Sequence, residues 1–153
     1  MLKFREIGTY KNAVNVGYCT ADVELHNGNV VTFDRATKKA AVPTDGKEAG
    51  LAIVMNTIDK PETLAPNDYV IEIGENPRLF VLTSLKGRII DMDMDQVDGT
   101  YADIAVGDFL VAEASGKLKA VKATEVADYK EYFVVSEKTS FNGEGLAVEV
   151  VIA

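Results

Sequence analysis

Tryptophan is absent from this chain of 153 residues, and cysteine and histidine each occur once. The single cysteine, Cys19, excludes an internal disulfide, and we expect it to be a small buried hydrophobic residue. A catalytic thiol needs a basic partner. The only histidine, His26, directly precedes the turn signal Asn27-Gly28, where we expect a polar turn residue. The chain is therefore predicted to fold without a disulfide and to have no thiol chemistry.

Long apolar runs are also lacking. No stretch approaches the roughly 18 apolar residues that a membrane helix requires, so no membrane partner is predicted. The first twelve residues contain no run typical of a signal peptide, so we expect synthesis in a reducing cytoplasm. Hydrophobic residues make up 47% of the chain and charged residues 26%, which is typical of a globular domain.

Basic residues are in the minority. Sixteen Lys and Arg stand against 24 Asp and Glu, and the formal net charge is −8. A chain this acidic repels phosphate backbones, and a nucleic-acid function would need a local basic cluster. Lys38 and Lys39 are the only adjacent basic pair, and Lys117, Lys119 and Lys122 are spread along one segment. We interpret both as solvated faces and predict no nucleic-acid partner.

Motifs of catalysis and cofactor binding are missing as well. The chain contains neither the GxxxxGK[ST] phosphate loop nor the GxGxxG dinucleotide-binding loop. It also lacks the GxSxG nucleophile elbow. We therefore predict no catalytic residues and no cofactor. The 24 carboxylates keep a carboxylate-based hydrolase open as an alternative, although sugar sites commonly use the large aromatic platforms that tryptophan provides.

The run DMDMDQVDG is the strongest candidate for a metal site. It holds Asp91, Asp93, Asp95 and Asp98. Alternating carboxylates open a calcium loop, but the sixth position is Gln96, not Gly, and the twelfth is Ala102, not Glu. A strand explains the pattern more simply, with Met92 and Met94 buried and the aspartates in solvent. We predict no metal site and keep a calcium-dependent module as an alternative.

Turn signals recur along the whole chain. They are Asn27-Gly28, Asp45-Gly46, Gly74 to Pro77, Lys86-Gly87, Asp98-Gly99, Ser115-Gly116 and Asn142-Gly143. The segments between them favour strands, predicted at 14–25, 29–33, 50–55, 69–73, 78–83, 88–94, 109–113, 117–121, 132–137 and 146–152. Helical pattern is limited to a short piece at 123–129 and to 61–67, where two prolines allow either one helical turn or a loop. The sequence therefore predicts an all-β fold, a compact barrel or sandwich with less than about 15% helix.

The order of elements repeats faintly. VVTFD at 30–34 is followed by KKAAV, GLAIVMN and DYVIEIG, and FLVAE at 109–113 is followed by KLKAV, EYFVVSE and GLAVEVV. An internal duplication gives this order, and so does the ordinary succession of hairpins in an all-β domain. Because no linker separates the two parts, we assign a single β domain to residues 13–153.

Residues 1–12 are predicted to form a flexible N-terminal arm. The arm carries apolar and basic side chains on an otherwise acidic chain, which favours docking on an acidic partner over a frayed end. The candidate partner-binding residues are Leu2, Lys3, Phe4, Arg5 and Ile7.

The last third of the chain resembles small phage head proteins of the decoration, or cement, type. In that group a G-D strand, a G-K-L hairpin and a final G-x-G strand close a compact β-barrel called a β-tulip. Here Gly107-Asp108, Gly116-Lys117-Leu118 and the segment from Gly143 to Val150 occupy those places. The resemblance covers about one third of the chain.

The resemblance implies a structural virion protein with no catalytic residues. Such a protein is made in the host cytoplasm, binds the major capsid protein on the outer capsid surface, often as a homotrimer, and stabilises the head lattice. Other phage structural roles, such as a tail tube or a head fibre base, remain alternatives, as do the hydrolase and the calcium-dependent module.

Overall fold

The chain folds into β-structure throughout the part that the computed structural model describes, residues 2–5, 13–140 and 143–153. Strands account for 38% and helical turns for 11%, and the turns are short 3-10 pieces, which confirms the all-β prediction and the low helix content. The 3-10 turns are η2 (Pro66–Asp68), η3 (Leu82–Leu85), η4 (Met94–Gln96), η5 (Tyr101–Asp103) and η6 (Val126–Asp128).

Two sheets form the molecule. Sheet A has the order β1-β8-β13-β12-β10-β11-β9, and sheet B the order β2-β7-β6-β4-β5-β3. The strands of sheet A are β1 (Leu2–Phe4), β8 (Ile89–Asp93), β9 (Val97–Asp98), β10 (Phe109–Ala112), β11 (Leu118–Val121), β12 (Glu131–Thr139) and β13 (Gly145–Ile152). Those of sheet B are β2 (Asn15–Val16), β3 (Thr20–Ala21), β4 (Val30–Asp34), β5 (Lys39–Ala41), β6 (Ala52–Val54) and β7 (Leu79–Val81).

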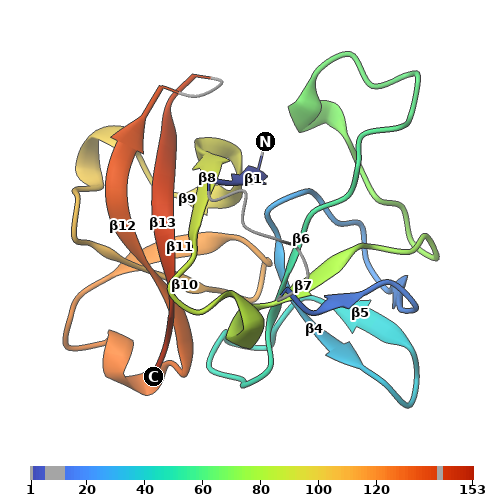
Figure 1. Cartoon of the computed structure of the whole chain (residues 1–153), viewed down its shortest axis with the longest axis horizontal. Coiled ribbons are helices and arrows are strands. Elements are labelled where there is room, and N and C mark those ends of the chain that lie inside the picture. Colours follow the sequence, from blue (N-terminus) through green and yellow to red (C-terminus); the bar gives the residue numbers. More distant parts are fainter. Residues whose placement is uncertain (1, 6–12, 141–142) are drawn as a thin grey trace.

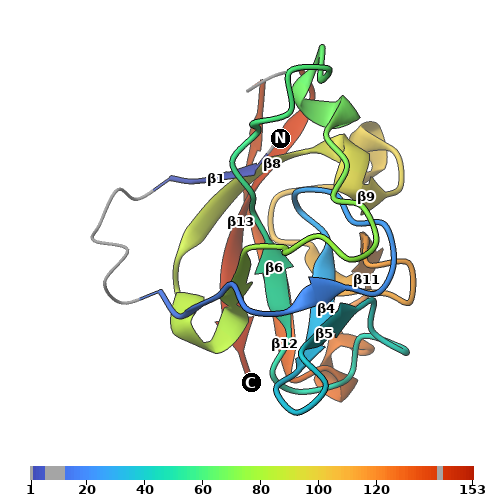
Figure 2. The same cartoon turned by 90° about the vertical axis from the view of Figure 1, so that its right-hand side faces the viewer.

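The two sheets pack against each other as a sandwich, so of the two predicted architectures the closed barrel is wrong. Figures 1 and 2 show sheet A on one side of the molecule and sheet B on the other. The main core lies between them and draws large side chains from both, among them Ile53, Phe80, Leu110, Phe133 and Val148. Apolar burial between the sheets is the main driving force that holds the sandwich together.

The strand order of one sheet repeats in the other. Adding six to each strand number of sheet B gives β8-β13-β12-β10-β11-β9, which is sheet A without β1. Each unit also contains one parallel pair in the same place, β3 with β5 and β9 with β11. The structure thus contains two copies of one six-stranded unit, which we call the first repeat (β2–β7) and the second repeat (β8–β13). The faint order seen in the sequence follows this topology, except that the counterpart of β13 is β7 and not 69–73.

Residue registers match between the repeats. In the first repeat, Val30 lies opposite Ile53, and Ile53 opposite Phe80. In the second, Phe109 lies opposite Val134, and Val134 opposite Glu149. The first row is buried in the core between the sheets, whereas the second row lies on the far side of sheet A. The repeats therefore stack head to tail, with one face of the first packed on the opposite face of the second.

The other face of sheet B is closed by the chain itself. A second apolar cluster there combines strand residues with Cys19, Leu25, Tyr69 and Ile71 from the connecting segments. Leu25 and Ile71 form a single antiparallel bridge, with mutual backbone hydrogen bonds of 3.0 and 2.8 Å. The segments 14–25 and 69–73, both predicted as strands, are thus mainly connections that cover sheet B.

One buried carboxylate links the repeats. Glu131, which is 2% exposed at the start of β12, accepts hydrogen bonds from the backbone N–H groups of Gly50 (2.9 Å) and Leu51 (2.7 Å). Burial raises the pKa of this carboxyl group, and the two N–H donors partly oppose that shift. The start of β12 is therefore fixed to the start of its counterpart, β6.

Candidate functional site

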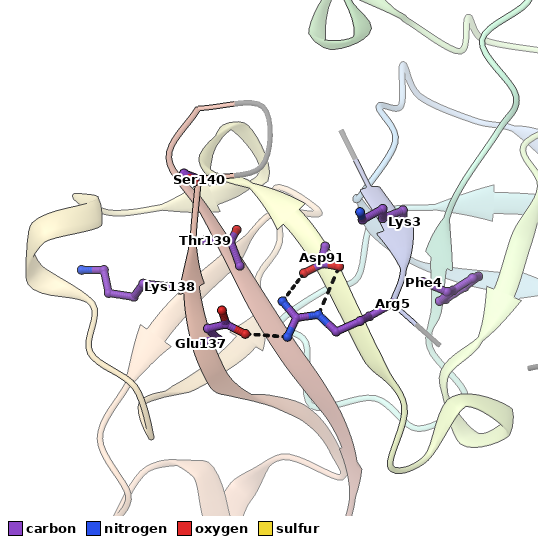
Figure 3. Close-up of a pocket in the computed structure, with 8 residues that line it drawn as sticks. All are labelled: Lys3, Phe4, Arg5, Asp91, Glu137, Lys138, Thr139 and Ser140. Atoms are coloured by element: carbon purple, nitrogen blue, oxygen red, sulfur yellow. Dashed lines mark hydrogen bonds and ion pairs between the residues drawn. The ribbon is translucent and has the colours of Figure 1, made fainter. Parts of the chain in front are cut away.

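A groove at the edge of sheet A contains three of the predicted partner-binding residues. It lies beside β1, β8 and the end of β12 and is lined by Lys3, Phe4, Arg5, Asp91, Glu137, Lys138, Thr139 and Ser140 (Figure 3). Its lining carries charges of both signs. The groove is the place where the basic N-terminal residues meet the acidic body of the chain.

Arg5 occupies the centre of this groove. Its guanidinium donates to both carboxylate oxygens of Asp91, at 2.8 and 3.4 Å, and to Glu137 at 2.6 Å (Figure 3). The Asp91 side chain is only 4% exposed, whereas those of Arg5 and Glu137 are 35% and 58% exposed. These hydrogen bonds, to Asp91 above all, raise the pKa of the Arg5 guanidinium still further above its usual range. The Arg5 guanidinium is therefore paired with two carboxylates of its own chain, those of Asp91 and Glu137.

The prediction of a free arm is wrong for residues 2–5. Leu2 to Phe4 form β1, which pairs antiparallel with β8. Leu2 is 7% exposed in the main core, and the ring of Phe4 packs edge-on against that of Phe80, with centroids 5.1 Å apart. Burial of these side chains and the ion pair of Arg5 stabilise the pairing of β1 with the chain's own sheet A. Ile7, the remaining candidate, lies outside the described residues.

Lys138 contributes to the wall of the groove without joining its charge network. Its ammonium group donates to the carbonyl oxygens of Tyr101 (2.5 Å) and Ile104 (2.8 Å) and lies 4.0 Å from the centre of the Tyr101 ring. In Figure 3 its side chain points away from Arg5. Lys138 thus fixes the segment around η5 against β12.

Only the start of the aspartate run is a strand as predicted: β8 ends at Asp93, Met94–Gln96 form η4, and Val97–Asp98 form β9. The predicted exposure is also only partly right. Asp91 and Asp93 are each 3% exposed, whereas Asp95 and Asp98 are exposed. Asp91 is buried because Arg5 neutralises it, and sequence spacing alone gives no sign of that partner. Within the described residues, no group of three His, Cys, Asp or Glu side chains is placed to hold a metal ion.

Replacing Arg5 by alanine is expected to lower the free energy of unfolding by about 2 kcal/mol. Losing one partner of a fully buried pair costs about 3 to 5 kcal/mol, and the exposure of Arg5 reduces that effect. Glu137→Ala, which removes only the exposed partner, is expected to cost less than about 0.5 kcal/mol. Urea denaturation of both variants measures the difference. Equal effects would mean that the Asp91 contact contributes nothing.

The two other singled-out residues are structural. Cys19 is fully buried, as predicted, and burial raises the pKa of its thiol. His26 is half-buried, and its ring Nδ1 lies 3.2 Å from the carbonyl oxygen of Tyr69. The strands predicted at 14–25 and 29–33, on either side of Asn27-Gly28, do not pair with each other as a hairpin, because β4 pairs with β5 and β6 instead.

A second candidate site is the loop between β6 and β7, which sequence reasoning missed. Residues 56–70 project beyond the sheets at the upper right of Figure 1. We call this segment the projecting loop. Leu64 on it is 94% exposed, the highest value among the exposed large hydrophobic residues. The sequence around Leu64, with two prolines nearby, predicts only a loop or one helical turn and gives no sign that the leucine is exposed.

The base of the projecting loop is tied to the body. Lys60 donates to the carbonyl oxygen of Val70 and pairs with the Glu75 carboxylate, both at 2.7 Å. Tyr69, which is 4% exposed, anchors the segment in which the loop returns to the body of the protein. At the other end, the side chain of Asn27 exchanges two hydrogen bonds with the backbone of Asn56, at 2.6 and 3.0 Å. The loop therefore presents Leu64 from a fixed base.

In the described part of the chain, no helix has the length and apolar character needed to cross a membrane. Comparison with known proteins gives no functional assignment: no protein-family model matches the chain, and no curated protein matches it either.

Proposed function

We propose that this protein is a structural virion protein that binds the outer surface of a phage capsid and stabilises the head lattice. The observation that carries a binding function is the projecting loop, which holds Leu64 almost fully in solvent on a tied base. Binding residues are disproportionately found on loops that a rigid scaffold positions. The capsid as partner, the virion location and a trimer on the particle come from the resemblance of the last third of the chain to decoration proteins.

The loop also defines the surface that it fits. Asp59, Glu62 and Asp68 lie around Leu64 in the sequence, and the one cation of the loop, Lys60, is paired with Glu75. The matching surface on the major capsid protein is an apolar pocket with basic residues at its rim. Many copies of such a contact, repeated over the head, stabilise the lattice even when each is weak.

A binding function also agrees with the groove at Arg5. The carboxylates of Asp91 and Glu137 both accept hydrogen bonds from the Arg5 guanidinium. This arrangement favours a structural role, in which Arg5 holds β1 on the sheet, over general acid–base chemistry. The hydrolase alternative needs one carboxylate that gives up a proton and one that accepts it.

Leu64→Asp is expected to reduce binding to capsids at least tenfold without affecting the fold. Burial of a leucine contributes about 1.5 to 3 kcal/mol, which corresponds to about 10- to 150-fold in affinity. The assay is co-sedimentation with empty heads of the phage that encodes the chain, prepared without this protein. Val106→Asp, at another exposed apolar position (61%), is the matched control.

Two results would contradict the proposal. If the wild-type protein does not sediment with the heads, the capsid is not its partner. Wild-type binding that Leu64→Asp leaves unchanged keeps the capsid and removes the projecting loop as the contact.

A further inference from the structure

A groove lies where β10 and β11 meet the segment that connects β11 to β12. That segment covers part of sheet A, because its Val126 and Tyr129 pack on Val111 and bury it. Beside this cover is a groove of about 480 Å³, which we call the β11 groove. Phe109 and Val121, which lie opposite each other, are only half-buried there, so the groove presents apolar surface to solvent. Its lining is Gly107, Asp108, Phe109, Ala120, Val121, Lys122, Ala123 and Glu125.

The charged side chains of the β11 groove differ in whether they have partners. The Asp108 carboxylate accepts a hydrogen bond from the backbone N–H of Ala105 at 2.8 Å. The Glu125 carboxylate accepts one from the backbone N–H of Lys122 at 3.2 Å. The exposed ammonium group of Lys122, in contrast, forms no ion pair with any residue that the structure describes. The groove thus combines apolar surface with a cation that is available to an anionic partner.

The projecting loop carries the complementary groups. Leu64 is 94% exposed, and Glu62, two residues before it, is exposed as well. In the part of the chain that the structure describes, the Glu62 carboxylate forms no ion pair. The other two acids of the loop, Asp59 and Asp68, accept hydrogen bonds from the loop itself. The loop therefore presents one apolar side chain and one available carboxylate close together.

The loop and the groove lie at opposite ends of the molecule. In Figure 1 the projecting loop is at the upper right, whereas the orange segment that follows β11 is at the lower left. Because the base of the loop is tied to the body through Lys60, the loop does not reach the groove of its own chain. A loop that enters a β11 groove therefore comes from another copy. Contacts of this kind join different surfaces of each copy, so they continue from copy to copy until a ring closes.

We propose that copies of the free protein associate by inserting the projecting loop of one copy into the β11 groove of the next. Leu64 then packs against Phe109 and Val121, which removes its side chain from water. Glu62 pairs with Lys122, which sets the orientation of the loop. The same loop is proposed above to bind the capsid, so association occupies it until a head is present. The inference does not depend on the capsid, because both halves of the contact lie on this chain.

Charge reversal tests the contact, measured by sedimentation velocity over a range of protein concentrations. Glu62→Lys and Lys122→Glu, as separate variants, are each expected to weaken association at least about fivefold, because like charges then meet in every contact. The double variant, with both substitutions in one chain, is expected to match the wild type within about twofold, since every contact again joins opposite charges. Lys130→Glu, at an exposed lysine outside the lining of the groove, is the control for net charge.

A second pair of variants tests the apolar half of the contact. Leu64→Asp is expected to give monomers, whereas Ile73→Asp, at a 66% exposed site outside the loop, is expected to leave association unchanged. Far-ultraviolet circular dichroism confirms that each variant is folded. A wild-type protein that stays monomeric at about 200 μM overturns the proposal. A double charge variant that associates no better than the two single variants overturns it as well.

Co-sedimentation with empty heads separates this inference from the proposed function. Leu64→Asp is expected to lose both association and capsid binding, whereas Lys122→Glu is expected to lose association and to keep capsid binding. Wild-type protein that associates but does not sediment with heads supports the contact between loop and groove and contradicts only the capsid as partner.

Discussion

Phe80→Ala is expected to lower the free energy of unfolding by about 3 to 5 kcal/mol. Phe80 is 1% exposed between the two sheets, where it contacts the ring of Phe4, and the guanidinium of Arg78 lies 5.0 Å from its centre. Truncation removes the apolar burial of the ring and leaves a cavity at the contact of the two repeats. It also removes the aromatic partner that helps to hold β1.

The second repeat supplies a matched control. Glu149 occupies the position of Phe80 in the same strand order and register, but it is exposed on the side of sheet A turned away from sheet B. Glu149→Ala is expected to change the free energy of unfolding by less than about 0.5 kcal/mol, as for other surface substitutions. Urea denaturation of the two variants measures both changes. Similar losses for the two variants would contradict the head-to-tail stacking of the repeats.

Gly46→Ala is expected to cost on the order of 3 kcal/mol or more. Gly46 has φ +77°, and a β-carbon there would lie 1.9 Å from the carbonyl oxygen of Ala112. A side chain is disfavoured in that conformation by about 1 to 2 kcal/mol, and backbone displacement adds about 1 to 3 kcal/mol. The turn after β5 approaches β10 of the other sheet too closely for any side chain.

Gly50→Ala separates the two causes. Gly50 has nearly the same backbone angle, φ +80°, but no atom lies within 4 Å of the position of its β-carbon. Only the conformational cost then applies, so a loss of about 1 to 2 kcal/mol is expected. Thermal and urea denaturation of the two variants give the comparison. A loss at Gly46 no larger than at Gly50 would show that the approach to Ala112 is not tight.

Local signals predicted much of the second repeat. Ser115-Gly116 joins β10 and β11 as expected, and β12 and β13 pair on either side of the predicted wide turn. The continuous apolar run at 50–55 contains β6, which is buried on both faces. In these places neighbours in sequence are also neighbours in the sheet, so turn chemistry and apolar pattern are sufficient.

Non-local partners account for the failures. The segment 14–25 contains two strands of two residues each, β2 and β3, which pair with β7 and β5. Asp91 is buried because of Arg5, 86 residues away in the sequence. The sequence shows the apolar and basic character of the N-terminal residues. Such side chains can pair with β8 and pack in the chain's own core as well as bind a groove on a partner protein.

The place of β1 has a consequence for synthesis on the ribosome. β1 is synthesised long before its pairing partner β8, which begins at Ile89, and before β13, the other neighbour of β8. Sheet A is therefore completed only after β13 has been synthesised, while the strands of sheet B are available earlier. Until then Leu2, Phe4 and the face of sheet B around Phe80 stay exposed, and long-range pairing of this kind slows folding. The interval before β13 is synthesised is thus when the nascent chain is most prone to aggregate.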